Sequence, residues 1–311
     1  MLKELHEIDL NSTDGERRLR AALRDGFFFV RNTVPEALLD DAYQLLEAFF
    51  TLPTEVKQEC RVPGSNGQSG YTPPLIETAE KGRVPDWKEL FHWGVRLPEN
   101  HPLRVRYPAR YPEPLLPEDI VPGIEAVLTE LHARMLAFQH EVASAVGRGL
   151  GVPAEYFAEL LQDGPVVNRA TWYPPMADAP SKDHVWAVEH QDFDLLTALP
   201  RATARGLQVQ AEDGSWLSVD APAGYAVVNV GMVLERLTDG LARAAVHRVV
   251  ADPDQQGGRL SIVQFCHPAP WTVLAPLRIP GETEHPRRFP ILTADDLFQR
   301  TMYRINRLGS R

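Results

Sequence analysis

The chain has 311 residues, of which 44% are hydrophobic and 24% charged, so it can bury the core of an ordinary globular protein. Its formal net charge of −10, without any long basic run, argues against a nucleic-acid-binding surface. It has only two cysteines, no signal-peptide core and no apolar run of about 20 residues, so the sequence predicts a cytoplasmic protein without a membrane span.

The N-terminal region begins with a buried strand and an amphipathic helix. Residues 26–30 are apolar and aromatic, as in a buried strand. Thr33 and Glu36 have the spacing of a capping box, with Pro35 between them, and predict the start of a helix that continues to Phe49 at helical spacing.

The next 70 residues are less regular. Residues 61–74 are rich in Gly, Ser and Pro and predict a surface loop, whereas residues 86–93 alternate in part and predict a strand. Five prolines between Pro108 and Pro122 exclude a regular helix there. Apolar residues then repeat at steps of three and four from Ile124 to Val146, which predicts a long helix on the outside of a sheet.

From residue 166 onward, short apolar runs alternate with Gly, Pro and Asp, as in an all-β protein. Asp213-Gly214 between two alternating arms indicates a hairpin. A terminal helix is expected over residues 293–306. Eight short strands in succession favour a sandwich or jelly roll over a βαβ sheet. They are predicted at residues 166–173, 185–190, 195–199, 207–211, 216–219, 225–230, 244–250 and 260–265.

Three residues of this region form a candidate metal site. Side chains two apart on a strand point the same way, so His190 and Asp192 share a face, and His247 lies in another predicted strand. Two imidazoles and one carboxylate suit Fe(II) and leave positions open, whereas catalytic zinc usually keeps a single open position. A lone histidine in an apolar strand is more often a core residue, so His247 alone identifies nothing.

The strand after His247 offers a candidate anion clamp. Arg259 and Ser261 project to one face, and a buried guanidinium beside a metal pocket matches a carboxylate with its planar fork. Taken alone, the pair fits a surface arginine and a solvated serine equally well. Following His190, Asp192 and His247 in this order, it predicts a carboxylate clamp for a 2-oxo acid.

The order of these motifs resembles the isopenicillin N synthase-like branch of the 2-oxoglutarate/Fe(II) oxygenases. The resemblance spans nearly the whole chain. It rests on Tyr173-Pro174, His190-Gln191-Asp192, Asn229-Val230-Gly231, His247-Arg248-Val249 and Arg259-Leu260-Ser261.

The resemblance implies a mainly β fold with flanking helices and a double-stranded β-helix (jelly roll) core. It implies that His190, Asp192 and His247 hold Fe(II). It also implies that Arg259 and Ser261 bind the distal carboxylate of 2-oxoglutarate. Tyr173 is expected to help by direct contact or by packing, and Asn229 either contacts 2-oxoglutarate or makes a structural hydrogen bond.

The implied organisation is a single oxygenase domain over residues 1–311. It comprises a mixed region (1–120), supporting helices (121–163), the jelly-roll core (164–270) and a C-terminal segment (271–311).

The implied reaction consumes O2 and 2-oxoglutarate, releases succinate and CO2, and oxidises a C–H bond of a small molecule by hydroxylation, desaturation or ring formation. Secondary or amino-acid-derived metabolism is its expected setting. The aromatic residues expected to line the substrate pocket each fit a core position equally well. They are Tyr71, Phe91, Trp93, Trp172, Phe193 and Phe265.

Three alternatives stay open at this point. One is an Fe(II) oxidase of the same fold that does not consume 2-oxoglutarate, as in isopenicillin N synthase. Another is a non-catalytic barrel that binds a small ligand, because fold does not fix function. A zinc hydrolase of the cupin type is disfavoured, since the sequence places no carboxylate at a spacing from the metal ligands that would indicate a general base. In each case the expected partner is a small molecule, with no nucleic acid, membrane or obligate protein partner.

Overall fold

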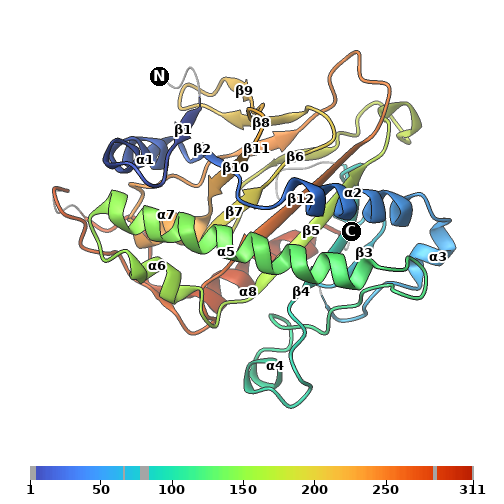
Figure 1. The fold of residues 1–311 in the computed structure, drawn as a ribbon, viewed down its shortest axis with the longest axis horizontal. Helices are drawn as coiled ribbons and strands as arrows, with labels where there is room; N and C mark the ends of the chain where they lie inside the picture. The colour runs from blue at the N-terminus through green and yellow to red at the C-terminus, as the bar shows by residue number, and fades with distance from the viewer. Residues whose placement is uncertain (1–4, 66, 78–83, 283–285, 310–311) are drawn as a thin grey trace.

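Two β-sheets form the centre of the molecule, and helices lie around them (Figure 1). The computed structural model describes residues 5–65, 67–77, 84–282 and 286–309. The helices are α1 (Thr13–Asp25), α2 (Glu36–Phe50), α3 (Thr54–Gln58), α4 (Pro102–Arg106), α5 (Ile124–Leu150), α6 (Glu155–Leu160), α7 (Met232–Leu237) and α8 (Ala294–Gly309), with a 3-10 turn at Met176–Asp178. The strands are β1 (His6–Ile8), β2 (Phe27–Arg31), β3 (Gly70–Thr72), β4 (Glu89–Gly94), β5 (Val166–Tyr173), β6 (Ala187–His190), β7 (Leu196–Leu199), β8 (Leu207–Gln210), β9 (Trp216–Ser218), β10 (Tyr225–Val230), β11 (His247–Val249), β12 (Arg259–Cys266), β13 (Val273–Leu274) and β14 (Leu292–Thr293).

The large sheet has the strand order β1-β2-β10-β7-β12-β5-β4-β3, and the small sheet has the order β6-β11-β8-β9. All neighbouring strands run antiparallel except β1 and β2, which are parallel. A separate pair, β13 and β14, lies outside these sheets. The predicted mainly β fold with flanking helices is confirmed, and each of the eight strands predicted after residue 166 is present.

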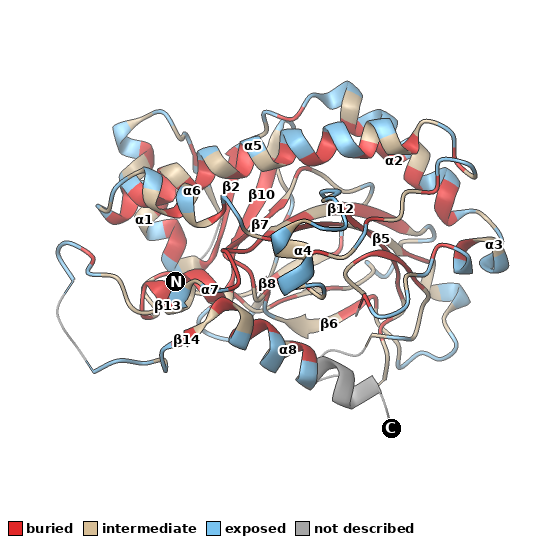
Figure 2. Cartoon of the chain, turned by 90° about the horizontal axis from the view of Figure 1, so that it is seen from below, coloured by how far each residue is buried: buried red, intermediate tan, exposed pale blue. Residues whose placement is uncertain are grey.

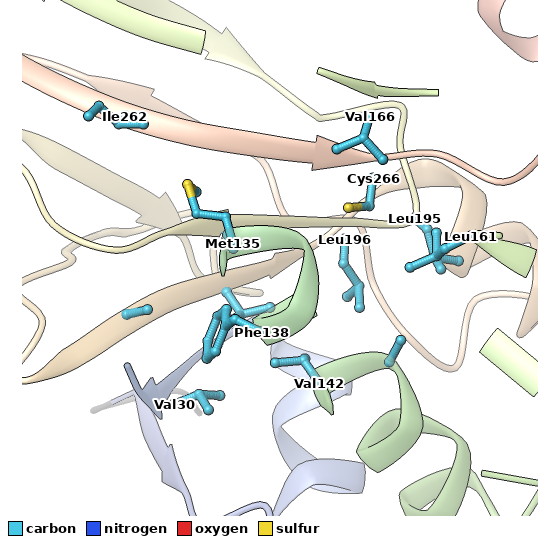
Figure 3. Close-up of a cluster of buried hydrophobic side chains, with 14 of the residues drawn as sticks. Val30, Met135, Phe138, Val142, Leu161, Val166, Leu195, Leu196, Ile262 and Cys266 are labelled. Atoms are coloured by element: carbon cyan, nitrogen blue, oxygen red, sulfur yellow. The ribbon is translucent and has the colours of Figure 1, made fainter. Parts of the chain in front are cut away.

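The long helix α5 packs on the large sheet through its apolar stripe, as its spacing predicted. Figure 3 shows Met135, Phe138 and Val142 of α5 in one buried cluster with Val30 of β2, Leu196 of β7 and Ile262 of β12. In Figure 2, α1, α2 and α5 turn their buried sides toward this sheet. One face of the large sheet is therefore closed by helices, and only its other face can border an internal cavity.

Two local predictions in the N-terminal region are wrong. Helix α2 begins at Glu36 after Pro35 and has no side-chain cap, so the predicted capping box is not formed. In the preceding turn, Asn32 Oδ1 accepts from the Val34 N–H (3.1 Å). The predicted loop contains the buried strand β3, which pairs with β4. Its first residue, Gly70, has a φ of 73°, and a Cβ there would lie 2.3 Å from the Cys60 carbonyl oxygen, so glycine is required within the strand.

Within the described residues, no helix combines the length and the apolar character needed to cross a membrane.

Candidate metal centre and adjoining cavity

Three potential metal ligands converge at one edge of the small sheet. His190 ends β6 and His247 begins β11, and the antiparallel register places these two residues opposite each other. Asp192 lies in the loop two residues beyond β6, so the prediction that it shares a strand with His190 is wrong, although its carboxylate still reaches the same side. One ligand atom from each residue lies within 4.8 Å of the others.

Backbone carbonyls fix the orientation of both imidazoles. Nδ1 of His190 lies 2.8 Å from the Val188 oxygen, and Nδ1 of His247 lies 3.2 Å from the Ala245 oxygen. Each Nδ1 therefore carries the proton, which leaves the lone pair of Nε2 free to bind a metal. The Nε2 atoms of His190 and His247 lie 3.9 Å and 3.8 Å from the carboxylate of Asp192. Burial and the neighbouring His247 lower the pKa of His190, so its ring is neutral, the form that binds metal.

The carboxylate of Asp192 is held by two hydrogen bonds. Its Oδ2 accepts from Asn229 Nδ2 (2.8 Å) and from Thr197 Oγ1 (2.7 Å). Burial by itself raises the pKa of Asp192, but the two histidines and these two hydrogen bonds together lower it below its usual range. Asp192 is thus ionised, and Asn229 makes a structural hydrogen bond to its carboxylate.

A second buried carboxyl supports this arrangement. Asp194 is 1% exposed, and burial together with Asp192 raises its pKa well above the usual range, so it is neutral. A neutral Asp194 can donate to Thr197 Oγ1 (2.9 Å), which directs the threonine proton to Asp192. Gly231 leaves room for this carboxyl, because a Cβ there would lie 2.1 Å from Asp194 Oδ1. The sequence reasoning missed Asp194 and Thr197, although Asp194 repeats the two-residue step from Asp192.

A cavity of about 70 Å³ adjoins the three ligands and lies between the two sheets. Strand alternation decides which side chains line it. Every second residue of β12 and β5 faces the cavity, namely Arg259, Ser261, Val263 and Phe265 on β12 and Arg169, Thr171 and Tyr173 on β5. The predicted shared face of Arg259 and Ser261 is therefore present.

Arg259 is buried in the cavity wall, with 2% of its surface exposed. Its Nε donates to the Ala204 carbonyl oxygen and its Nη1 to Ser261 Oγ, both at 3.0 Å, and its guanidinium lies 5.1 Å from the Tyr173 ring centre. No carboxylate in the described part of the chain forms an ion pair with Arg259. A buried guanidinium without a counter-ion fits an anionic ligand, because an unpaired buried charge is costly.

Four of the six aromatic candidates lie on the other face of the large sheet. Phe91 contacts Phe49 of α2, with ring centres 4.7 Å apart, and Trp93 donates to the Leu128 carbonyl of α5 at 3.1 Å. Tyr71 is paired with Phe91, and Trp172 alternates with the cavity residues of β5, so both face the helices too. The structure shows a packing role for these four residues, and substrate contact by them stays a prediction.

The other two aromatic candidates lie nearer the metal site. Phe265 lines the cavity. Phe193, next to Asp192, packs against His267 and against Phe298 of α8, with ring centres 5.4 Å and 5.9 Å apart. The cavity wall also contains Lys88 and Arg169, which the sequence reasoning did not single out.

The donor atoms fit an iron centre with a bound 2-oxo acid. Two imidazole nitrogens and one ionised carboxylate form the ligand set of non-haem Fe(II) oxygenases. Arg259 supplies the buried positive charge that the far carboxylate of such an acid requires.

Comparison with known proteins matches two parts of the chain to two dioxygenase families. Residues 162–268 match the 2OG-Fe(II) oxygenase superfamily. Residues 8–114 match the N-terminal family described as non-haem dioxygenase in morphine synthesis. A 2-oxoglutarate-dependent dioxygenase of Gibberella zeae is 31% identical over 269 residues, which cover 80% of this chain and 69% of the relative.

Solved structures agree over almost the full length. A 2OG-Fe(II) oxygenase family protein from Caulobacter crescentus has 30% identity and a TM-score of 0.82, with 97% of this chain and 98% of that chain covered. A rice dioxygenase for auxin oxidation has 26% identity and a TM-score of 0.71, with coverage of 98% and 99%. The chain therefore belongs to the 2OG-Fe(II) oxygenase superfamily, with its double-stranded β-helix core, and is a 2-oxoglutarate-dependent dioxygenase that uses Fe(II).

Proposed function

We propose that His190, Asp192 and His247 hold Fe(II), and that Arg259, Ser261 and Tyr173 hold the distal carboxylate of 2-oxoglutarate. One observation carries this assignment: the three ligand atoms converge within 4.8 Å beside a cavity whose wall contains a buried arginine without a carboxylate partner among the described residues. The reaction is the oxidation of a C–H bond in a small molecule by hydroxylation, desaturation or ring formation.

Different residues of the chain orient the metal ligands and bind the co-substrate. Bound Fe(II) with 2-oxoglutarate and O2 supplies the oxidising power, as in the rest of the family. The carbonyls of Val188 and Ala245 hold each imidazole with Nε2 toward the metal position, and Asn229 holds the carboxylate of Asp192. Arg259 orients the co-substrate by charge-assisted hydrogen bonds. Apolar side chains from both sheets, among them Phe27, Leu207 and Val227, form the rest of the cavity wall.

The metal assignment is tested by His247→Ala. Removal of one of three ligands is expected to abolish stoichiometric Fe(II) binding, measured anaerobically by metal analysis after gel filtration. His140→Ala provides the matched control, because His140 is a half-buried histidine of α5 outside the cavity. Unchanged iron content in His247→Ala would refute the assignment and favour a non-catalytic barrel.

The co-substrate assignment is tested by adding 2-oxoglutarate to the Fe(II) protein under anaerobic conditions. We expect a visible charge-transfer band, and we expect Arg259→Ala to weaken 2-oxoglutarate binding by about 10- to 100-fold, the effect of losing hydrogen bonds to a charged group. Arg248→Ala is the control, since Arg248 is outside the cavity and stacks on Trp216. An iron-loaded wild type without the band would favour an oxidase that does not consume 2-oxoglutarate.

We further propose that the protein works in the cytoplasm on small molecules, without a membrane, nucleic-acid or obligate protein partner. Cys60 and Cys266 are buried and free, which suits a reducing compartment, and the net charge of −10 disfavours nucleic acid. Cell fractionation and light scattering of the purified chain test this proposal. Recovery in a membrane fraction, or a stable complex with another protein, would contradict it.

A further inference from the structure

A second arginine lines the same cavity wall as Arg259. Arg169 lies on β5 opposite Val263 of β12, whereas Arg259 lies opposite Tyr173. The two positions are therefore four steps apart along the strands, a distance of about 13 Å. Because Arg259 is assigned to 2-oxoglutarate, Arg169 is available to another ligand.

The guanidinium of Arg169 is held in place by two contacts. Its Nε donates to Nε2 of His92 (2.6 Å), and its centre lies 5.0 Å from the ring of Phe265. Burial and the charge of Arg169 lower the pKa of His92 well below its usual range, so His92 is a neutral acceptor. The two contacts orient the guanidinium without neutralising its charge.

The acidic residues nearby are bound mainly to a different cation. Lys88 Nζ lies 2.8 Å from Asp86 Oδ2 and 3.3 Å from Glu77 Oε2. Glu77 also forms a long ion pair with Arg169, in which its Oε1 lies 4.0 Å from Nη2, beyond hydrogen-bond length. Within the described residues, no carboxylate thus forms a hydrogen bond with Arg169, whose side chain is 23% exposed.

We propose that Arg169 binds a carboxylate of the primary substrate, so that the substrate of this dioxygenase is a small organic acid. The inference rests on the proposed function, because it takes Arg259 as occupied by 2-oxoglutarate. The planar fork of an arginine matches a carboxylate with two parallel hydrogen bonds. Phe265, which stacks on Arg169 and also lines the cavity, provides an apolar surface for the carbon frame beside that carboxylate.

The experiment measures binding to the full chain loaded anaerobically with Fe(II) and saturating 2-oxoglutarate. Calorimetric titrations compare each acid with its neutral amide, using hexanoate and hexanamide, phenylacetate and phenylacetamide, and cyclohexanecarboxylate and its amide. We expect at least one acid to bind the wild type about 10-fold or more tightly than its amide, and Arg169→Gln to remove that preference.

Two further variants separate recognition from general charge or folding effects. Arg248→Gln is the matched control, because Arg248 also stacks on an aromatic ring, that of Trp216, and its Nε donates to Gln208, yet it does not line the cavity. It is expected to keep the wild-type preference for the acid. Arg169→Lys keeps the charge without the planar fork and is expected to give an intermediate preference.

Three outcomes would overturn the inference: no acid in the panel binding the wild type better than its amide, a preference that survives Arg169→Gln, or a preference lost equally in Arg248→Gln. The charge-transfer band of the same samples keeps the two proposals apart. A band missing in the wild type refutes the proposed function, whereas a band lost only in Arg169→Gln assigns Arg169 to 2-oxoglutarate and refutes this inference alone.

Discussion

At the scale of single residues, each proposed ligand is held by a contact behind it. Asp192 depends on Asn229 and Thr197, and each histidine depends on one backbone carbonyl. Such contacts fix the direction of the donor atoms before metal arrives, which reduces the cost of ordering the site. The strength of metal binding therefore depends on residues that never touch the metal.

Asn229→Ala tests this dependence. Loss of the hydrogen bond to Asp192 Oδ2 is expected to weaken Fe(II) binding by about 10- to 100-fold. Because that bond lowers the pKa of Asp192, the variant is also expected to lose metal at a higher pH than the wild type. Anaerobic Fe(II) titrations at several pH values measure both effects. Asn32→Ala, in a turn outside the cavity, serves as control, and equal affinities in all three proteins would contradict the prediction.

At the scale of elements, a network of buried hydrogen bonds connects α5 to the large sheet. Gln139 of α5 donates to the Gln264 carbonyl of β12 (2.8 Å), and Gln264 in turn donates to Asn168 of β5 (2.9 Å). Asn168 donates to Nδ1 of His132 on α5 (2.7 Å), which closes the network. Apolar packing holds the helix on the sheet, and this network specifies its register, since each buried polar group needs its partner.

The network predicts a pH dependence of stability. Burial lowers the pKa of His132 to about 4, against about 6.5 in the unfolded chain. Between these values the unfolded state binds a proton that the folded state does not, so the free energy of unfolding falls as pH decreases from about 6.5 to 4, by up to about 3 kcal/mol from this group. Above pH 6.5 the group has no effect.

His132→Gln removes this contribution. We expect urea unfolding of the metal-free variant at pH 7 and pH 4.5 to show a smaller loss of stability than the wild type over the same interval. An identical loss of stability in both proteins would mean that folding does not lower the pKa of His132, and would contradict the prediction.

At the scale of the whole molecule, the large sheet joins the two regions that match separate sequence families. Strands β1 to β4 come from the N-terminal region, and they pair in one sheet with β10 and β5 of the core. Helix α5, between the two regions in sequence, covers that sheet. The single domain over residues 1–311 stays a prediction, and the shared sheet is the observation that supports it.

We therefore expect one cooperative unfolding transition, with coincident urea curves from far-ultraviolet circular dichroism and from tryptophan fluorescence. A fragment of residues 162–268 is expected to aggregate, because it lacks α5 and exposes the helix-covered face of the sheet. Two separated transitions, or a soluble folded fragment, would show two independent domains.

The sequence by itself determined the strands of the core, the long helix before them and the order of the site residues along the chain. Short apolar runs between turn residues predicted the strands after residue 166, and the order of His190, Asp192, His247 and Arg259 indicated iron and a 2-oxo acid. These features depend on local spacing, which the chain carries along its length. The same spacing shows that Tyr173 and Trp172 face opposite sides of β5.

Only the tertiary structure decided which of those sides is the cavity. The packing of α2 and α5 turned Phe91, Trp93 and Trp172 toward the helices, while Arg169 and Tyr173 face the cavity. Alternation fixes the relation between neighbouring side chains, but the face that becomes interior depends on partners more than 30 residues away in sequence. For the same reason, the support that Asp192 receives from Thr197 and Asn229 appears only after the chain has folded.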